Sequence, residues 1–230
     1  MSLSWTKALD EYCYPVDLAS YKRASEFPGF FDRQILGNRA STIAFEIHYQ
    51  HVARQHYAAF LEVVYWKLYS QRQLRNKVTS RVSCFFRERG VTCSQLWAAV
   101  QAFSDDPTIS TLRKIRELLG FTTPVLAVPA TLPALASPST IPMVDNQVAR
   151  WVNMNAKVHS INRKSKLAEF SMNYTSLREN DFPSYLKWVV WCREVAGVLT
   201  RLTGFEWRAR DVEMAVFTAQ RSGLQLNVLR

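Results

Sequence analysis

Glycine is scarce in this sequence, with only 7 glycines among 230 residues. No Asn-Gly or Asp-Gly dipeptide, the usual signal of a tight hairpin turn, lies between alternating apolar runs. All-β sandwiches and barrels need many tight turns, so the scarcity of glycine argues against both. The chain must instead use elements that need few turns.

The chain also lacks the usual signatures of metal sites and membrane spans. No two of its four cysteines have the C-x-x-C spacing of zinc or redox sites; they are Cys13, Cys84, Cys93 and Cys192. We expect buried or free thiols in a reducing compartment. No apolar run reaches the roughly 18 residues of a transmembrane helix. Residues 1–5 lack the basic and apolar regions of a secretory signal, so we expect a cytoplasmic (nucleoid) or nuclear location, not secretion and not a membrane.

Three histidines, His48, His51 and His56, fall in one expected helix, where His48 and His51 share a face. A metal site needs a third converging ligand, and the sequence offers none that can be placed there. We therefore expect no metal and no cofactor.

Apolar residues make up 48% of the chain and aromatic residues 13%, a composition too apolar for a disordered protein. A chain of this length buries about 70% of its unfolded surface, enough for one large domain or two small ones. Lys and Arg outnumber Asp and Glu by 29 to 19, giving a net charge of +10. This charge favours a polyanionic partner such as nucleic acid, or serves solubility alone.

Apolar residues recur every three or four positions through most of the chain, which predicts helices. We expect an all-α, multi-helix globular fold with about nine or ten helices. The clearest expected helices cover about residues 41–69, 73–89, 93–103, 107–119, 124–136, 182–203 and 209–221, and another begins at Asp145. Residues 157–180 are polar and irregular, and they are the best candidate for a linker.

Particular residues predict where these helices begin and end. Gly90, Gly120 and Gly204 stand where left-handed C-terminal caps are expected. Asp106 with Pro107, and Thr123 with Pro124, have the order of an N-cap followed by a first helical proline. Residues 119–123 would then form a tight turn of a helical hairpin. Helix 182–203 has an apolar stripe that we expect to be buried: Tyr185, Trp188, Cys192, Val195, Leu199 and Leu202.

Two segments could carry chemistry. The N–H groups at the helix start after residues 119–123 could bind a phosphate, although an ordinary interhelical turn explains the same residues. Asp145 has the sequence position of an N-cap. A carboxylate there could also stabilise positive charge developing on a sugar, or activate a water molecule.

A third segment, residues 207–213, is a dense polar and aromatic cluster that contains Trp207, Arg208, Arg210, Asp211 and Glu213. It could clamp a phosphate or form an ion-pair network at a helix start.

These segments together resemble the helix-hairpin-helix DNA glycosylase superfamily. The family signature is a hairpin Gly, then a Pro, then a catalytic Asp, matched here by Gly120, Pro142 and Asp145. The run Val-Asp-Asn-Gln-Val-Ala-Arg over residues 144–150 is similar to the family's Val-Asp-Thr-His-Val-Ala-Arg, and residues 68–73 resemble its Leu-Ser-x-Gln or Ser-Gln-Gln stretch. The resemblance covers roughly residues 60–155 of a single all-α domain spanning 1–230, which could also be two helical subdomains.

The resemblance implies roles for particular residues. Asp145 would be the catalytic carboxylate. Duplex DNA, damaged or intact, would be held by Gly120, Phe121, Thr122, Thr123, Gln71 and Arg72, with basic surfaces near residues 72–81 and 163–166. A Gln of this kind can help fill the gap left by an extruded base. The flipped base would stack on Tyr65, Trp66 or Trp151, although helical aromatic residues more often belong to a core.

The sequence departs from the family in four respects, the first of which is a short stretch between residues 68–73 and the hairpin. Thr122 stands at the second hairpin glycine, and Pro124 stands where bifunctional members carry a Schiff-base Lys. Clustered cysteines for an iron–sulfur cluster are also absent. The resemblance therefore implies a monofunctional N-glycosylase without β-lyase activity. The alternatives are a non-catalytic DNA- or RNA-binding protein and a helical protein-interaction module.

Overall fold

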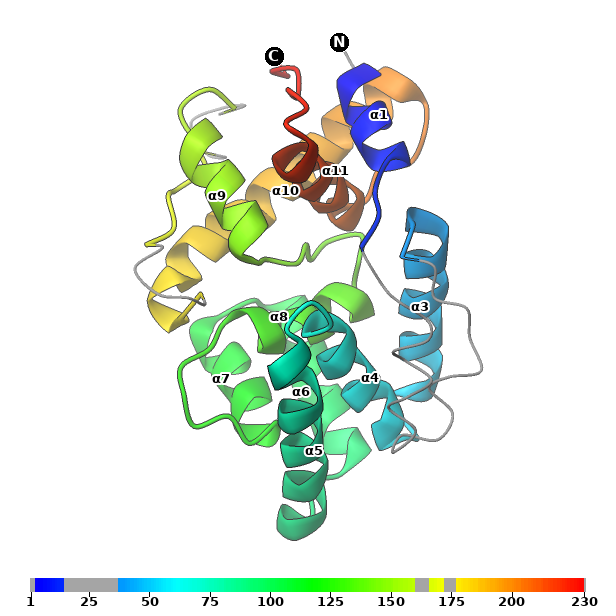
Figure 1. Cartoon of the computed structure of the whole chain (residues 1–230), viewed down its shortest axis with the longest axis vertical. Helices are drawn as coiled ribbons and strands as arrows, with labels where there is room; N and C mark the ends of the chain where they lie inside the picture. The colour runs from blue at the N-terminus through cyan, green and yellow to red at the C-terminus, as the bar shows by residue number, and fades with distance from the viewer. Residues whose placement is uncertain (1–2, 15–36, 160–165, 172–176, 230) are drawn as a thin grey trace. The chain divides into compact units, whose positions relative to one another are not determined.

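The computed structural model describes residues 3–14, 37–159, 166–171 and 177–229. In these ranges it contains ten α-helices, one short 3-10 helix and no strand, which confirms the all-α fold class (Figure 1). The helices are α1 (Leu3–Asp10), α3 (Arg39–Val52), α4 (Tyr57–Lys67), α5 (Arg72–Arg89), α6 (Cys93–Asp105), α7 (Ile109–Leu118), α8 (Ala127–Ala136), α9 (Asn146–Asn155), η1 (Glu179–Asp181), α10 (Phe182–Thr203) and α11 (Ala209–Ser222). None of the described helices has the length and apolar character needed to cross a membrane.

The chain divides into two compact units. Unit 1 consists of Met1–Tyr12, Val125–Ala130 and Ser137–Arg230, and unit 2 consists of Cys13–Pro124 and Thr131–Ala136. Helix α8 therefore begins in unit 1 and ends in unit 2. Each unit has a buried core of its own.

Helix α11 lies at the centre of unit 1. Its residues from Ala209 to Ala219 are all buried, and α1, α9 and α10 contact it (Figure 1). A helix buried on every side is normally apolar all round, but α11 contains Arg210, Asp211 and Glu213. Arg210 is paired with Glu213 on the same helix, and this pairing compensates the two charges in the interior.

Aromatic rings from three helices fill the rest of this core. Trp5 of α1 and Trp151 of α9 lie 6.2 Å and 5.7 Å from Trp191 of α10, measured between ring centroids. Trp191 also stacks on Trp188 at 5.2 Å. Trp191 thus contacts three other large rings, and the apolar area that they bury ties α1 to the C-terminal half of the chain.

His159 joins the same cluster, 5.0 Å from the ring of Trp151. Burial lowers the pKa of His159, because desolvation penalises the charged imidazolium.

Helix α4 is the buried centre of unit 2. Every residue from Ala59 to Lys67 is buried, and both α3 and α5 contact this helix. Helices α6 and α7 contact each other in the same unit. Each begins with a capping box, formed by Thr92 with Gln95 in α6 and by Thr108 with Thr111 in α7. These reciprocal hydrogen bonds satisfy N–H groups that have no partner within the helix.

Most predicted helix ends are confirmed. Helix α10 has the bounds predicted from its apolar pattern, and Gly90, Gly120 and Gly204 follow α5, α7 and α10 with positive φ. Asp145 is the N-cap of α9, as predicted. The described parts of 157–180 contain turns, irregular backbone, a bridge residue at Arg178 and the start of η1, in line with the predicted irregular segment. Residues 160–165 and 172–176 lie outside the described residues.

The prediction of one helix over residues 41–69 is wrong. The chain leaves the helical conformation between α3 and α4, and His56 is extended, with φ −131° and ψ 126°. The helical spacing of Val52, His56 and Phe60 predicts His56 on the apolar face of that helix, but His56 is exposed. No Gly or Pro lies at the break, and apolar residues continue at helical spacing on both sides of it, so the pattern gave no signal of the turn.

Three further expectations need correction. Thr108 rather than Asp106 caps α7, while the Asp106 N–H bonds to Ala102 at the end of α6. Helix α8 begins at Ala127 rather than at Pro124, because the Leu126 N–H donates to the Leu177 carbonyl and Val125 forms a β-bridge with Arg178. Thr123 is therefore not an N-cap. Finally, Leu202 is 55% exposed instead of buried.

The buried ion pair in α11 yields a stability prediction. We expect Glu213→Ala to lower the free energy of unfolding by about 3–5 kcal/mol, because the Arg210 guanidinium loses this carboxylate in a site closed to solvent. The control is Glu11→Ala, which breaks an exposed pair with Lys7. It should cost less than about 1 kcal/mol. Urea unfolding of both variants measures the difference, and equal costs would contradict the assigned role of the pair.

Candidate nucleic-acid interface and the Asp145 carboxylate

The turn after α7 is a Schellman motif. The Gly120 N–H donates to the Glu117 carbonyl at 3.0 Å, and the Phe121 N–H donates to the Arg116 carbonyl at 3.1 Å. Both N–H groups are therefore used within the turn and do not face a ligand. The exposed residues Thr122 and Thr123 make no hydrogen bond with the described part of the chain, so their N–H groups and hydroxyls face solvent.

Gly120 is held against helix α5. A Cβ atom added at Gly120 would lie 2.5 Å from Cγ of Phe85 and within 3 Å of two more atoms of the same ring. Its φ of +73° also favours glycine. Glycine at this position thus serves two needs at once, the left-handed turn and the close approach of an aromatic ring.

Arg81 extends the contact between α5 and the turn. Its guanidinium lies over the Phe121 ring, 5.4 Å from the centroid. Phe121 is buried and Arg81 is exposed, so the ring supports a charge that stays in solvent. The structure therefore brings Arg81 together with three of the predicted DNA-contacting residues, Phe121, Thr122 and Thr123.

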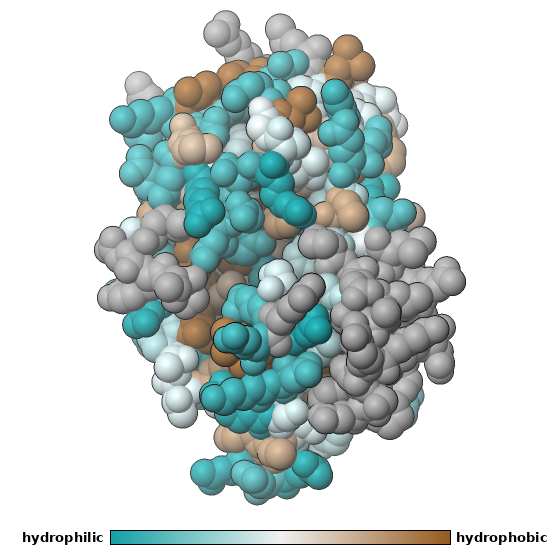
Figure 2. All heavy atoms as spheres, in the orientation of Figure 1, coloured by the Kyte–Doolittle hydropathy of each residue, from teal (hydrophilic) through white to brown (hydrophobic). Residues whose placement is uncertain are grey.

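Helix α5 is the most basic helix of unit 2, with six basic residues and one acidic residue in 18 positions. Lys77 and Arg81 are exposed and one helical turn apart, and Arg87 and Arg89 are also exposed near its C-terminus. Figure 2 shows one face of the molecule, on which hydrophilic side chains predominate over the region of α5. Arg113 and Lys114 of α7 are also exposed and add to the positive charge of the unit.

Not every Arg of α5 is available to a ligand. Arg75 lies over the rings of Tyr65 and Tyr69, at 5.5 Å and 4.7 Å, and donates to the Tyr69 carbonyl. These contacts hold its guanidinium on the protein. Gln71, predicted to contact DNA, is exposed just before α5, and Arg72 is the first residue of the helix; the placement of the Arg72 side chain lies outside what is described.

The predicted base-stacking residues lie in the two cores. Tyr65 and Trp66 of α4 are 1% and 0% exposed in unit 2. The ring centroid of Trp66 lies 4.8 Å from that of Tyr14. Trp151 is 4% exposed and belongs to the aromatic cluster of unit 1. Stacking on a base would require these rings to become accessible, so the base pocket stays a prediction.

Asp145 lies in unit 1, where it begins α9. Its Oδ1 accepts hydrogen bonds from the N–H groups of Gln147 at 2.9 Å and Val148 at 3.0 Å. The residue is half-buried, and Val144 before it is fully buried. The carboxylate is thus fixed in orientation at a helix N-terminus, and the residue is partly accessible to solvent. This arrangement suits a helix cap. It also suits a carboxylate that stabilises positive charge on a bound ligand.

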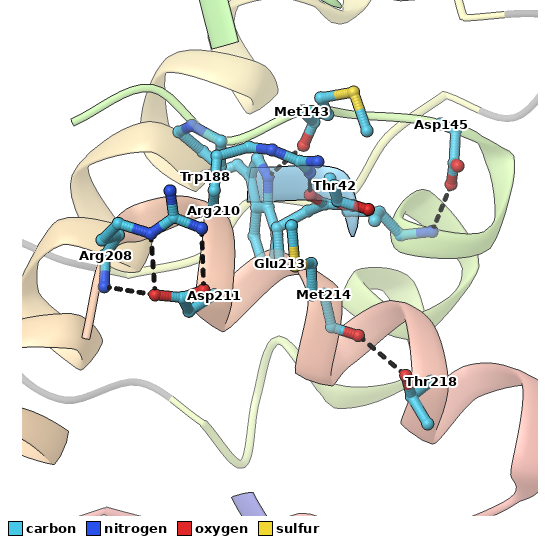
Figure 3. A network of polar contacts seen from close by, with 12 residues as sticks. Thr42, Met143, Asp145, Trp188, Arg208, Arg210, Asp211, Glu213, Met214 and Thr218 are labelled. Atoms are coloured by element: carbon cyan, nitrogen blue, oxygen red, sulfur yellow. Dashed lines mark hydrogen bonds and ion pairs between the residues drawn. The ribbon is translucent and has the colours of Figure 1, made fainter. Parts of the chain in front are cut away.

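The segment before Asp145 is held by hydrogen bonds along its length. In residues 138–143, five of the six carbonyls accept a hydrogen bond from α10 or α11. The donors are the backbone N–H groups of Arg210 and Ala209 and the side chains of Arg193, Tyr185 and Trp188. Figure 3 shows Trp188 of α10 bonded to the Met143 carbonyl, with Asp145 farther along the same segment.

Sequence reasoning missed these donors. Tyr185 and Trp188 were predicted only as members of the apolar stripe of α10. The only signal in the sequence is that most buried Tyr and Trp side chains find an acceptor for their O–H or N–H. That signal does not identify an acceptor more than 40 residues away along the chain.

Residues 207–213 form the predicted ion-pair network. The Nε of Arg208 lies 3.0 Å from Oδ2 of Asp211, and a second bond joins the same two side chains (Figure 3). Asp211 also accepts a hydrogen bond from the backbone N–H of Arg208, directly before α11. Arg210 is fully buried and paired with Glu213, so it does not present a phosphate clamp to solvent.

Of the histidines considered as metal ligands, His48 bonds to the buried carboxylate of Glu62 at 3.1 Å, a partner not predicted from the sequence. His51 and His56 are exposed. Among the residues that the structure describes, no three His, Cys, Asp or Glu side chains converge as metal ligands would. Residues 163–166, predicted as a basic surface, lie outside the described residues except for exposed Lys166.

The hairpin glycine and the carboxylate belong to different units, Gly120 to unit 2 and Asp145 to unit 1. No family model, curated protein or solved structure matches this chain.

The contact between Gly120 and Phe85 can be tested by substitution. Gly120→Ala should destabilise unit 2 more than Gly90→Ala does. Both glycines have positive φ, which costs alanine about 1–2 kcal/mol, but only Gly120 has atoms within 4 Å of the added methyl group. Overpacking adds about 1–3 kcal/mol at Gly120.

Urea unfolding of the two variants measures this excess. The excess should shrink in a Phe85→Leu background, where a smaller, flexible side chain faces the methyl group. The close approach of Phe85 to Gly120 would be contradicted if Gly120→Ala destabilised the protein no more than Gly90→Ala. It would also be contradicted if Phe85→Leu left the difference between them unchanged.

Proposed function

We propose that this protein binds duplex DNA through α5 and the turn at residues 119–123. The observation that carries the proposal is the exposed guanidinium of Arg81, supported on the Phe121 ring beside the solvent-facing Thr122 and Thr123. Lys77, one helical turn away, extends the positive charge along the same side of α5.

These groups suit the nucleic-acid backbone better than the bases. Arg and Lys side chains, hydroxyls and backbone N–H groups are the usual donors to phosphate oxygens, and such contacts supply most of the non-specific affinity for DNA. The resemblance of the Gly120 and Asp145 segments to the helix-hairpin-helix glycosylases favours DNA over RNA as the partner. The net charge of +10 adds attraction at long range.

A second candidate function is the hydrolytic removal of a damaged base. The specific observation is that Asp145 is half-buried and oriented by two backbone N–H groups, within the segment that matches the family's Val-Asp run. In this proposal the carboxylate stabilises the positive charge that develops on the sugar as the base leaves, or activates the attacking water. Pro124 at the position of the family's Lys is consistent with hydrolysis alone, without β-lyase activity.

The binding face is tested by the salt dependence of affinity. We expect Lys77→Gln and Arg81→Gln each to weaken binding to a labelled 20-base-pair duplex. Each should reduce the slope of log K against log salt by about 0.9, because one phosphate contact is lost. Arg201→Gln is the control, since this exposed Arg of unit 1 lies in the last turn of α10.

Fluorescence anisotropy at several salt concentrations gives the slopes. An equal loss in the control variant would contradict the assigned face. Tighter binding to an RNA duplex of the same sequence would assign the face to RNA.

Base removal is tested with duplexes carrying a panel of lesions, followed by hot alkali to cleave abasic sites. We expect an abasic product from at least one lesion with the unmodified protein and none with Asp145→Asn. Asn is as good an N-cap as Asp, so this substitution removes the charge and leaves the start of α9 intact. Absence of product from every lesion, or full activity in Asp145→Asn, would overturn the catalytic proposal.

A further inference from the structure

Three side chains of α10 bind the segment that leads to Asp145. The hydroxyl of Tyr185 donates to the Pro142 carbonyl at 3.0 Å, and the Nε1 of Trp188 donates to the Met143 carbonyl at 2.9 Å. Arg193 donates to the Thr140 carbonyl at 2.7 Å. The first two bonds lie within three residues of the carboxylate, so they have the most direct influence on its position.

The bonds from Tyr185 and Trp188 form in an interior closed to water. Both side chains are 0% exposed, and Met143 and Val144 are 3% and 0% exposed. A buried carbonyl that loses its donor has no water to replace it, so the lost bond costs more than it would at the surface. Burial also raises the pKa of Tyr185, which keeps its hydroxyl protonated as a donor.

Neighbouring rings restrict the rotamers of both donors. Trp188 stacks on Trp191 with an interplanar angle of 19°, and Tyr185 lies 6.2 Å from the ring of Phe182. The two donors are three residues apart on α10, which places them on the same face of the helix. A rigid helix face thus holds two consecutive carbonyls.

Asp145 is consequently held from two directions. Its carboxylate is oriented by the N–H groups of Gln147 and Val148 at the start of α9. Its backbone follows directly from the carbonyls that α10 holds. We propose that Tyr185 and Trp188 are positioning residues for the Asp145 carboxylate. This inference rests on the proposed role of Asp145 in base removal.

The consequence for the reaction is large because catalytic geometry is demanding. A displacement of about 1 Å in a catalytic group can cost about 100-fold in rate. Loss of the hydrogen bond at Pro142 would allow the segment to move without removing the carboxylate or its contacts with α9. The rate of base release should therefore fall while DNA binding is unchanged.

The test variant is Tyr185→Phe, which keeps the buried ring and removes only the hydroxyl. Its matched control is Tyr49→Phe in unit 2. Tyr49 is also 0% exposed, but its hydroxyl makes no hydrogen bond with the described part of the chain. Removing that hydroxyl leaves every carbonyl near Asp145 with its donor.

The first measurement is native-state hydrogen exchange of the Gln147 and Val148 amides, followed by NMR in the full chain. We expect Tyr185→Phe to accelerate their exchange about fivefold, the equivalent of one net hydrogen bond of about 1 kcal/mol. The Val216 amide in α11 should change less, which separates a local effect from a general loss of stability. Tyr49→Phe should leave the Gln147 and Val148 amides unchanged. Unchanged exchange in Tyr185→Phe overturns the proposal whatever the activity.

The second measurement separates chemistry from binding. Single-turnover base release at saturating protein should slow by about 10- to 100-fold in Tyr185→Phe. The Kd for the duplex should stay within about twofold of the unmodified protein, because α10 is not part of the proposed DNA face.

The combined outcomes distinguish the two proposals. Faster exchange with an unchanged rate of base release overturns the positioning role alone and leaves Asp145 as the catalytic carboxylate. Absence of base release by the unmodified protein overturns the catalytic role of Asp145, and the positioning role with it.

Discussion

Hydrogen bonds to the backbone of residues 138–143 are the interaction on which the organisation of unit 1 depends. Five of the six carbonyls in this segment accept a hydrogen bond from α10 or α11. Those of Pro142 and Met143 lie in its buried part, where a carbonyl needs a donor from the protein. These bonds also constrain the positions of α10 and α11, because the donors on both helices must reach the carbonyls of this segment. The segment contains two prolines. The start of α9, and with it the orientation of Asp145, follows from this arrangement.

In unit 2 the equivalent constraint is the approach of Phe85 to Gly120. It places the turn after α7 against α5, and it brings the exposed Arg81 onto the Phe121 ring. Packing and charge are therefore linked: the apolar contact that closes the turn also determines where a cation is presented to solvent. This link is the physical basis for assigning the DNA-binding face to α5 and the turn rather than to the net charge alone.

The sequence predicted features that depend on neighbouring residues. The bounds of α10, the left-handed caps at Gly90 and Gly120 and the N-cap at Asp145 are all local and were predicted correctly. The break at residues 53–56 was missed because apolar spacing continues through it. Asp106 was predicted as the N-cap of α7, but the cap is Thr108, which forms a capping box with Thr111. The donors Tyr185 and Trp188 could not be paired with their carbonyls from sequence, because those bonds depend on tertiary packing.

The most direct test of the account is an NMR titration of the full chain with a 20-base-pair duplex at low salt. The account predicts that the largest amide shift changes occur at Thr122 and Thr123 and along the exposed side of α5 around Lys77 and Arg81. Changes centred instead on the exposed end of α10 near Leu202, with none on α5 or the turn, would contradict the proposed binding face.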